Sequence, residues 1–287
     1  MQEKKRGRTH SRWLLPAALV LAGAAWFENF TLSTSTVTAA CAALPEAFSG
    51  LRIVQISDLH GRRFDAESRY LLELVRLQSP DLIALTGDLA DEFTDFSMLP
   101  PLLDGLTALA PTFYVTGNHE WVLSREKREV LFSMLDAAGV VRLQNEYRLL
   151  KKGQASIVLA GVDDPNGPYD QKRPAQLVRE IRQSWGRDAY ILMLSHRNDE
   201  LDLWANMGVQ TVLCGHGHGG IVRLPFVGAV FGTHLDLFPD YTAGLYRKGQ
   251  TSMIVSRGLG GSRKLPLRIG NRPEIVTVIL KAESGKV

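Results

Sequence analysis

Histidines and carboxylates recur at a few points of this 287-residue chain, each time directly after an apolar run. Five of its seven histidines stand at such points, and the stretch "LCGHGHGG" (213–220) carries two of them one residue apart. Imidazole and carboxylate groups bind divalent metal ions, and they also transfer protons during catalysis. We therefore expect metal binding, proton transfer or both.

The candidate groups follow five of the apolar runs, in order along the chain, and consist of oxygen and nitrogen donors: Asp58 and His60, Asp88, Asn118 and His119, His196, and His216 and His218. A set without a thiolate fits manganese, iron or zinc at a reactive centre better than a structural cysteine-rich zinc site. So many donors exceed the needs of one ion and suit two ions about 3.5–4 Å apart that share a carboxylate. Asp88 stands in the middle of the set and is the expected bridge.

Each of these motifs also has a plainer explanation. Asp-x-His after a strand is often a helix cap, Gly-Asp is often a turn, and a histidine after a strand is often a hydrogen-bonded core residue. Five apolar runs that all end in such residues, in order along the chain, are hard to obtain by chance, so we favour the functional interpretation.

The apolar runs alternate with helical stretches, and this pattern predicts an α/β fold. Runs begin near residues 51, 80, 111, 156, 189 and 209, with helices expected from Ser124 to Gly139 and from about Pro174. Strands that are apolar almost throughout are typical of a largely parallel sheet buried on both faces, whose carboxyl ends border the ligand crevice. Beyond residue 219 we expect antiparallel structure, with a hairpin that turns at Lys248-Gly249 and a final strand over 273–281.

The amino-terminal residues have the composition of a signal or anchor. Residues 13–27 form a fifteen-residue stretch without charge. Five basic residues precede this stretch: Lys4, Lys5, Arg6, Arg8 and Arg12. We expect a signal or membrane anchor over 1–27, a linker with at most an edge strand over 28–49, and one catalytic domain over 50–287. The positive-inside rule then places that domain outside the cytoplasm; secretion after signal cleavage is the alternative. The two cysteines, Cys41 and Cys214, are not expected to pair.

Taken together, the motifs resemble the five-block signature of the calcineurin-like metallophosphoesterases. The blocks occur in the family's order: Asp58-x-His60, Gly87-Asp88, Gly117-Asn118-His119-Glu120, His196 and Gly215-His216-Gly217-His218. The resemblance covers about residues 50–281, and the stretch "SRGLGGSRKLPLRIGNRPEI" looks most like the bacterial membrane-associated phosphodiesterase branch. It implies an α/β/β/α sandwich with a mixed sheet, preceded here by a signal-anchor helix.

The resemblance also implies roles for single residues. One divalent ion (manganese, iron or zinc) would be held by Asp58, His60 and His218, and a second by Asn118, His196 and His216, with Asp88 as the bridge. His119 would face the substrate, oriented by Asp91, which could equally be a solvated loop acid. Arg62 and Arg197 are candidates for binding phosphate, or are ordinary surface arginines. Glu92 stands where protein phosphatases of this family carry an arginine, which argues against that activity.

These roles imply hydrolysis of a phosphodiester or pyrophosphate bond by a metal-bridging hydroxide. Together with the anchor, they suggest a membrane-associated or lipid-linked substrate. A basic and apolar rim for its headgroup could come from residues 224–228 with Arg257, Arg263, Lys264 and Arg268, or these could be ordinary surface residues. A metal-dependent nuclease and a non-catalytic scaffold are the alternatives. Nucleic acid is not an expected partner, because the pI of 8.9 comes without a basic stripe flanked by aromatics in the catalytic domain.

Overall fold

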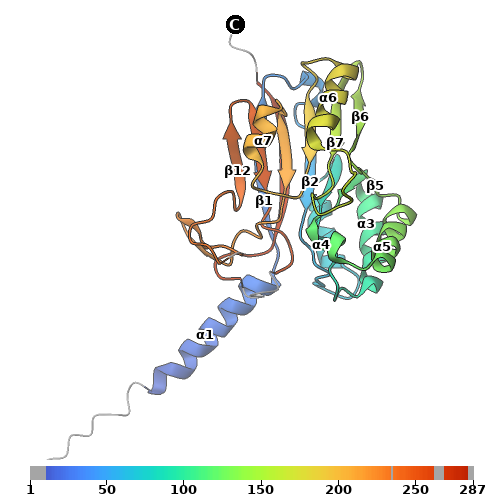
Figure 1. The fold of residues 1–287 in the computed structure, drawn as a ribbon. Coiled ribbons are helices and arrows are strands. Elements are labelled where there is room, and N and C mark those ends of the chain that lie inside the picture. Colours follow the sequence, from blue (N-terminus) through green and yellow to red (C-terminus); the bar gives the residue numbers. More distant parts are fainter. Residues whose placement is uncertain (1–10, 234, 262–267, 284–287) are drawn as a thin grey trace, which may run out of the picture.

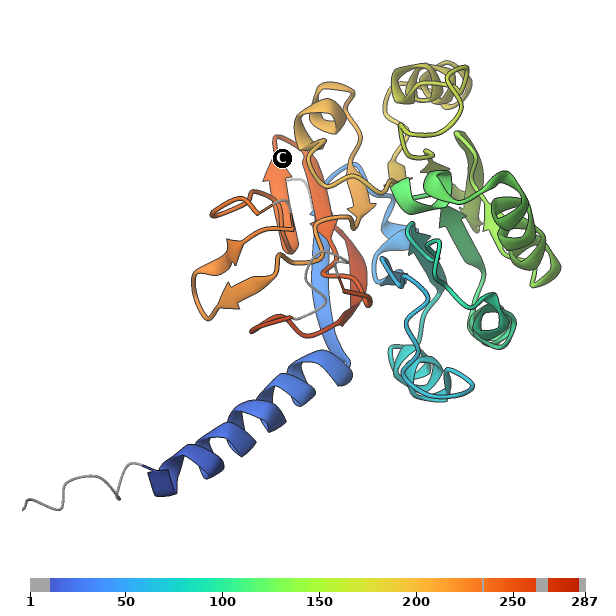
Figure 2. The same cartoon turned by 60° about the horizontal axis from the view of Figure 1, so that its bottom comes forward.

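The computed structural model describes residues 11–233, 235–261 and 268–283. Two six-stranded sheets lie face to face in the centre, and helices cover their outer faces (Figures 1 and 2). The helices are α1 (Ser11–Phe30), α2 (Arg69–Leu77), α3 (Leu99–Leu109), α4 (Asn118–Val122), α5 (Arg125–Ala137), α6 (Pro174–Trp185) and α7 (Leu201–Asn206), with short 3-10 turns η1 (Glu46–Phe48) and η2 (Phe96–Met98).

The first sheet is mixed. Its order is β1 (Ser33–Cys41), β14 (Glu274–Ala282), β2 (Arg52–Ile56), β3 (Leu82–Thr86), β4 (Thr112–Val115) and β5 (Val141–Arg142). Strands β2 to β5 run parallel to one another, β14 is antiparallel to β2, and β1 is parallel to β14. The carboxyl ends of β2, β3 and β4 therefore lie at one edge of this sheet.

The second sheet is also mixed. Its order is β12 (Gly244–Lys248), β13 (Thr251–Val255), β9 (Thr211–Cys214), β8 (Ile191–Leu194), β7 (Ala155–Gly161) and β6 (Glu146–Lys152). The four inner strands are parallel, and the two outer strands are antiparallel to their neighbours. A separate ribbon joins β10 (Val222–Leu224) to β11 (Gly228–Phe231). The expected hairpin at Lys248-Gly249 is confirmed as β12–β13, and the expected last strand as β14.

Three apolar layers hold these elements together. The inner faces of the two sheets pack on each other through residues such as Ile53, Ala84, Leu192 and Leu213. Helices α2, α3 and α5 pack on the outer face of the first sheet, and α6 and α7 on that of the second. The molecule is thus an α/β fold with two mixed sheets between helical layers, as the resemblance implied.

The amino-terminal region contributes to the fold. β1 lies at the edge of the first sheet, within the range 28–49 that we expected to be a linker, and all nine of its residues pair with β14. The expected anchor overlaps α1, whereas residues 1–10 lie outside the described part of the chain. Among the described residues, no helix is both long and apolar enough to cross a membrane. Cys41 and Cys214 are buried and free, as expected.

Candidate metal centre

The metal-type donors follow the carboxyl ends of five parallel strands, three from the first sheet and two from the second. A direct contact ties the two sheets together at this point: the side-chain amide nitrogen of Gln55, near the end of β2, donates to the Cys214 carbonyl at the end of β9, at 2.8 Å. Because both sheets present these ends at the same place, loops far apart in the sequence meet there.

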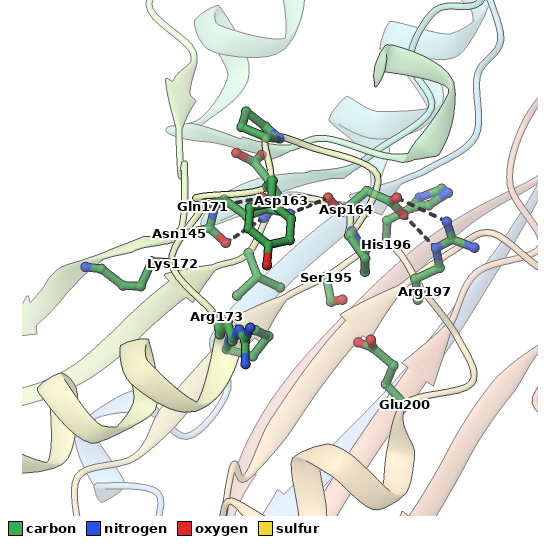
Figure 3. Close-up of a pocket in the computed structure, with 15 residues that line it drawn as sticks. Asn145, Asp163, Asp164, Gln171, Lys172, Arg173, Ser195, His196, Arg197 and Glu200 are labelled. Atoms are coloured by element: carbon green, nitrogen blue, oxygen red, sulfur yellow. Dashed lines mark hydrogen bonds and ion pairs between the residues drawn. The ribbon is translucent and has the colours of Figure 1, made fainter. Parts of the chain in front are cut away.

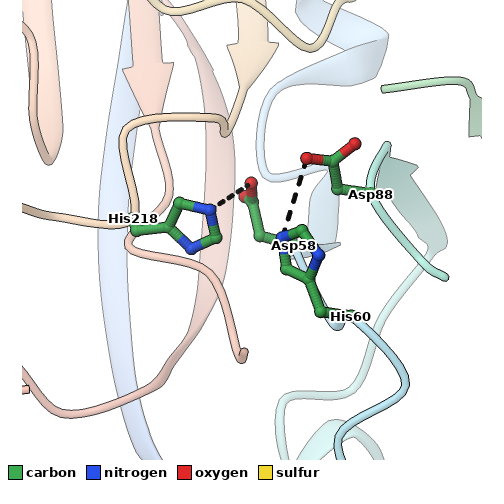
Figure 4. Close-up of side chains that lie close together, drawn as sticks. All are labelled: Asp58, His60, Asp88 and His218. Carbon is green, nitrogen blue, oxygen red and sulfur yellow. Dashed lines mark ion pairs between the residues drawn. The ribbon is translucent and has the colours of Figure 1, made fainter. Parts of the chain in front are cut away.

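The first group of donors combines Asp58, His60 and Asp88 with His218, and one donor atom of each lies within 4.8 Å of the others. Figure 4 shows the two carboxylates beside the imidazole rings. His60 Nε2 lies 3.6 Å from Asp88 Oδ2, and His218 Nε2 lies 3.6 Å from Asp58 Oδ1. These residues come from loops after β2, β3 and β9.

The second group contains Asp88, His196 and His216, again within 4.8 Å of one another. His196 Nε2 lies 3.2 Å from Asp88 Oδ2 and 3.2 Å from His216 Nδ1. The other ring nitrogen of His196 lies 2.8 Å from the Thr86 carbonyl, which fixes the ring orientation. Asp88 is therefore the member that the two groups share.

The donor atoms fit divalent ions better than an apo hydrogen-bond network. Within the described residues, Asn118 Oδ1, both ring nitrogens of His60 and His218 Nδ1 are buried without a hydrogen-bond partner. Orphaned buried polar atoms are rare and costly unless a ligand completes them. Carboxylate, amide and imidazole donors match manganese, iron or zinc. Asn118 also fits the expected second group by its place after β4.

The backbone at these positions is strained. Five donor residues have φ between 48° and 66°, in the left-handed region: Asp58, His60, Asp88, His216 and His218. Each such residue costs on the order of 1–3 kcal/mol, and such strain concentrates at functional sites. An adjacent glycine allows the close approach, because a Cβ on Gly215 would overlap Asp58 Oδ2.

Burial and neighbouring charges set the protonation of the donors. Burial would raise the pKa of Asp88, but the His196 and His60 rings outweigh it and hold that pKa well below its usual range. Burial, helped by the His196 ring, lowers the pKa of His216 to about 3, so this ring is neutral near pH 7. Burial would also lower the pKa of His196, but Asp88 raises it to about 10. An ion bound there must displace that proton.

Glu120 is a functional residue whose role sequence reasoning missed. It is fully buried at the start of α4 and accepts four backbone N–H groups: those of Asp88 (2.9 Å), Leu89 (2.7 Å), Ala90 (3.2 Å) and Gly117 (2.7 Å). Its carboxylate thus joins the loop of Asp88 to the loop of Asn118. The only sequence signal for this role was the position of Glu120 in the block Gly117-Asn118-His119-Glu120.

His119 and Asp91 both lie beside the first group. The His119 ring packs edge-on to His60, with centroids 4.7 Å apart, and its backbone N–H donates to Asp88 Oδ1 at 2.8 Å. Asp91 Oδ2 lies 3.7 Å from His60 Nδ1, and its other oxygen accepts from Phe93 N and Thr94 Oγ1. The expected orienting action of Asp91 on His119 stays a prediction.

The two arginines expected to bind phosphate differ in position. Arg197 lies beside the second group, 3.3 Å from His216 Nε2, and a two-point ion pair with buried Asp164 holds it there at 2.7 and 3.1 Å. Arg62 points to the end of α1, where it donates to the Asn29 carbonyl and lies over the Phe30 ring. The structure therefore brings Arg197, but not the Arg62 guanidinium, to the metal-type donors.

The expected basic rim is wrong for Arg268. Arg268 is only 3% exposed, because its guanidinium binds backbone carbonyls inside the molecule. Arg257 is paired with Glu274 at 3.0 Å. Residues 263 and 264 lie outside the described part of the chain.

A cavity of about 270 Å³ opens beside the second group (Figure 3). His196 and Arg197 form one wall, and the loop after β7 forms another, with Tyr169 at the surface. Polar and charged residues of the lining also include Asn145, Asp163, Gln171, Lys172, Arg173, Ser195 and Glu200. On the other side of Arg197, a second hollow of about 420 Å³ reaches His216 and residues 239–242. The donor cluster therefore has space on both sides of Arg197.

Comparisons with known proteins agree with this site. A family model described as calcineurin-like phosphoesterase matches residues 51–220. The chain is 30% identical over 267 residues to YkuE, an uncharacterized metallophosphoesterase of Bacillus subtilis strain 168, covering 90% of this chain and 89% of YkuE. It is 31% identical over 234 residues to the phosphodiesterase YaeI of Escherichia coli K12, covering 80% of this chain and 82% of YaeI.

A solved structure, that of the Thermus thermophilus protein TT1561, is similar with a TM-score of 0.47 and 14% identity, covering 73% of this chain and 90% of that one. The family match spans all five donor loops from Asp58 to His218, and the aspartates and histidines of both groups are intact. The chain belongs to the calcineurin-like phosphoesterase family and is a metallophosphoesterase.

Proposed function

We propose that this enzyme hydrolyses a phosphodiester or pyrophosphate bond at a centre of two divalent ions. The observation that carries the proposal is the position of Asp88, a single buried carboxylate common to both donor groups. Two ions that share a carboxylate form the kind of site that cleaves phosphate esters. The name of the relative YaeI, a phosphodiesterase, supports a diester as substrate.

The residues around those ions would have different roles. Asp58, His60 and His218 would hold one ion, and Asn118, His196 and His216 the other, with Asp88 in common. When bound, the ions would activate water for attack and neutralise charge on the phosphoryl oxygens. His119, at the edge of the first group, is placed to protonate the leaving oxygen, and Arg197 to bind a phosphoryl oxygen.

The test is an assay of the full chain loaded with Mn²⁺ on bis-p-nitrophenyl phosphate and p-nitrophenyl phosphate. We expect faster cleavage of the diester, and a loss of at least about 100-fold in Asp88→Asn, because both ions lose a ligand. Asp104→Asn, an exposed aspartate of α3, is the matched control and should keep full activity. Equal activity of Asp88→Asn and Asp104→Asn would refute the proposal, and a preference for the monoester would refute the diester assignment.

A metal-dependent nuclease is the second candidate, since the same chemistry cleaves nucleic-acid diesters. Nuclease action predicts binding to DNA or RNA that weakens steeply with salt. We expect no such binding in a fluorescence anisotropy titration, and salt-dependent binding would favour the nuclease.

We further propose that the enzyme works at a bilayer surface, which suits a lipid-linked substrate. Exposed apolar side chains support this proposal: Leu19, Val20, Trp26, Phe27 and Phe30 on α1, and Leu224, Phe226 and Val227 around the β10–β11 turn. Both segments project from the same side of the molecule (Figures 1 and 2). Projecting apolar tips of this kind suit insertion between lipid headgroups.

Sedimentation with vesicles of phosphatidylethanolamine and phosphatidylglycerol tests the membrane proposal. The double change Phe226→Ser and Val227→Ser should lower the bound fraction, while Trp185→Ser, on α6 at the opposite end of the molecule in Figure 1, should not. No sedimentation of the unaltered chain would contradict it. We also propose that the catalytic domain lies outside the cytoplasm, because basic residues precede the uncharged stretch 13–27. Secretion is the alternative, and protease digestion of intact spheroplasts distinguishes both from a cytoplasmic domain.

A further inference from the structure

A buried arginine lies behind the metal-type donors without supplying one. The guanidinium of Arg268 donates to the backbone carbonyls of Arg257 (2.9 Å), Gly258 (3.3 Å), Gly260 (3.1 Å from Nε) and Asn271 (3.4 Å). The side chain is 3% exposed. Burying a charge is costly, so a buried guanidinium that binds several carbonyls at once is expected to have a specific task.

The first task concerns Asp58. The segment 257–260, which Arg268 holds, packs directly on the loop that carries Asp58: Gly260 N donates to the Asp58 carbonyl at 2.5 Å, and Leu259 N to the Ser57 carbonyl at 3.0 Å. A Cβ on Gly258 would lie 2.7 Å from Asp58 Cβ. A shift of this segment would therefore move the Asp58 carboxylate.

The second task concerns His218. Arg268 binds the carbonyl of Asn271, whose Nδ2 donates to the His218 carbonyl at 2.8 Å and to the Gly220 carbonyl at 2.6 Å. Asp58 and His218 have φ of 50° and 49°, conformations that persist only when surrounding contacts enforce them. Arg268 is thus in contact with the supports of two strained donors of the first group.

The backbone of Arg268 is bound to the side chain of Asn29, near the end of α1. Asn29 Oδ1 accepts from Arg268 N at 2.8 Å, and Asn29 Nδ2 donates to the Arg268 carbonyl at 3.0 Å. The same Nδ2 donates to the Ala25 carbonyl inside α1 at 2.7 Å, and Asn29 is 5% exposed. A continuous path of hydrogen bonds therefore runs from α1 through Arg268 to Asp58 and His218.

We propose that Arg268 is a positioning residue for the first metal site, and that Asn29 keeps Arg268 in place. The proposal rests on the two-metal centre proposed above. It extends the metal site beyond the five donor loops to the end of α1 and to residues 257–260 and 268–271, which supply none of the proposed ligands. Mutation of a residue that holds a metal ligand in place typically changes metal affinity by about 10–100-fold.

The experiment measures Mn²⁺ binding to the metal-free full chain by isothermal titration calorimetry, with thermal unfolding recorded in parallel. An Asn118→Ala, His216→Ala background, which lacks two expected donors of the second group, weakens that site, so that binding at the first site dominates. In that background Arg268→Lys keeps the charge but not the fork of donors, and we expect Mn²⁺ affinity to fall by about 10-fold or more. Asn29→Ala should lower it by a smaller factor.

Arg182→Lys is the matched control. The Arg182 guanidinium also donates to two backbone carbonyls, those of Ala189 (2.5 Å) and Gly208 (2.6 Å), between α6 and the start of β8 and β9. It should lose stability but keep its Mn²⁺ affinity. If Arg268→Lys does not fold, Asn29→Ala decides the question.

Unchanged Mn²⁺ affinity in Arg268→Lys and Asn29→Ala, with stability loss alone, would overturn the inference and leave the enzyme proposal intact. Failure of the unaltered chain to bind two Mn²⁺ ions would instead overturn the proposed metal centre itself. The two failures are therefore distinguishable.

Discussion

Two buried carboxylates at the centre, Asp88 and Glu120, have different tasks. Asp88 Oδ2 lies beside the imidazoles of His60 and His196, and its Oδ1 accepts the His119 backbone N–H, whereas Glu120 directs both of its oxygens to backbone amides. Burial and the nearby Asp88 raise the pKa of Glu120, while the Gly117 and Ala90 amides oppose the rise. One carboxylate is thus available to ions, and the other fixes the loops that present it.

Replacing Glu120 by Gln should therefore destabilise the protein. The amide NH₂ would face backbone N–H donors, leaving at least one buried donor without an acceptor, at a cost of about 2–3 kcal/mol. Thermal or urea unfolding measures the loss. Glu129→Gln, whose carboxylate forms an exposed ion pair with Arg125, is the control and should change stability by less than about 1 kcal/mol. Equal effects of the two changes would contradict the role of Glu120.

Glu200, in the wall of the 270 Å³ cavity, should make stability depend on pH. Burial, with Asp199 beside it, raises the pKa of Glu200 from 4.5 to about 7. The folded state favours the protonated form of Glu200. Glu200 therefore contributes stability that is complete below about pH 4.5 and is lost as pH rises through about 7. Between pH 5 and pH 8 we expect Glu200→Gln to gain roughly 1–3 kcal/mol relative to the unaltered chain. Free energies of unfolding of Glu200→Gln and of the unaltered chain that change with pH in the same way would contradict this expectation.

At the residue scale, the sequence predicted the donors better than their supports. Titratable residues after apolar strands stand out because a buried strand does not otherwise accommodate them, and the aspartates and histidines so identified do meet. Arg268 was expected at the surface, since nothing in its sequence surroundings, between Leu267 and Ile269, shows that carbonyls will surround it. The role of Glu120 was equally hard to predict, because a carboxylate that binds backbone amides needs no partner residue at a fixed spacing in the sequence.

At the element scale, the short loops after the strands position the donors, and close backbone approach is built into them. Gly117, between β4 and α4, has no room for a side chain: a Cβ there would overlap Asp88 Oδ1 and would lie 2.6 Å from Asp88 N. The loops after β3 and β4 are therefore packed against each other through backbone atoms.

Gly117→Ala should consequently displace Asp88 and impair metal binding. We expect at least about a 10-fold loss of Mn²⁺ affinity by calorimetry, because Asp88 is shared by both groups. Gly139→Ala, where a Cβ would meet open space but φ is +78°, is the control. It should cost about 1 kcal/mol of stability and leave Mn²⁺ affinity unchanged. A Gly117→Ala protein that binds Mn²⁺ like the unaltered chain would refute this account of the loop.

The elements themselves were predictable where the pattern was strong. The apolar runs became β2, β3, β4, β7, β8 and β9, and Ser124 caps α5 as expected, accepting from Lys127 N at 3.3 Å. β1 was harder to predict, because its polar sequence "STSTVTAAC" resembles a spacer and its partner β14 lies about 240 residues away. Pairing between such distant segments leaves no local signal.

At the scale of the whole molecule, the donors connect the two sheets. Asp58, His60 and Asp88 follow strands of the first sheet, whereas His196, His216 and His218 follow strands of the second. Bound ions would therefore join the two halves of the sandwich in the folded state, and the unfolded chain has no such preformed site.

Metal ions should accordingly stabilise the fold. We expect Mn²⁺ to raise the melting temperature of the metal-free full chain, with a gain of about 2.7 kcal/mol when free Mn²⁺ is about 100 times its Kd, and chelation to reverse it. Differential scanning calorimetry measures the shift. Asp88→Asn should show a much smaller gain, while an equal gain would mean that Mn²⁺ stabilises the protein from elsewhere.

The most direct test of the central claim is electron paramagnetic resonance of the full chain titrated with Mn²⁺, combined with metal analysis. We expect two Mn²⁺ ions per chain with the spectrum of an exchange-coupled pair, because ions that share the Asp88 carboxylate would lie about 3.5–4 Å apart. The coupled signal should be lost in Asp88→Asn and kept in Asp104→Asn. A single ion per chain, or two ions without coupling, would contradict a centre built around Asp88.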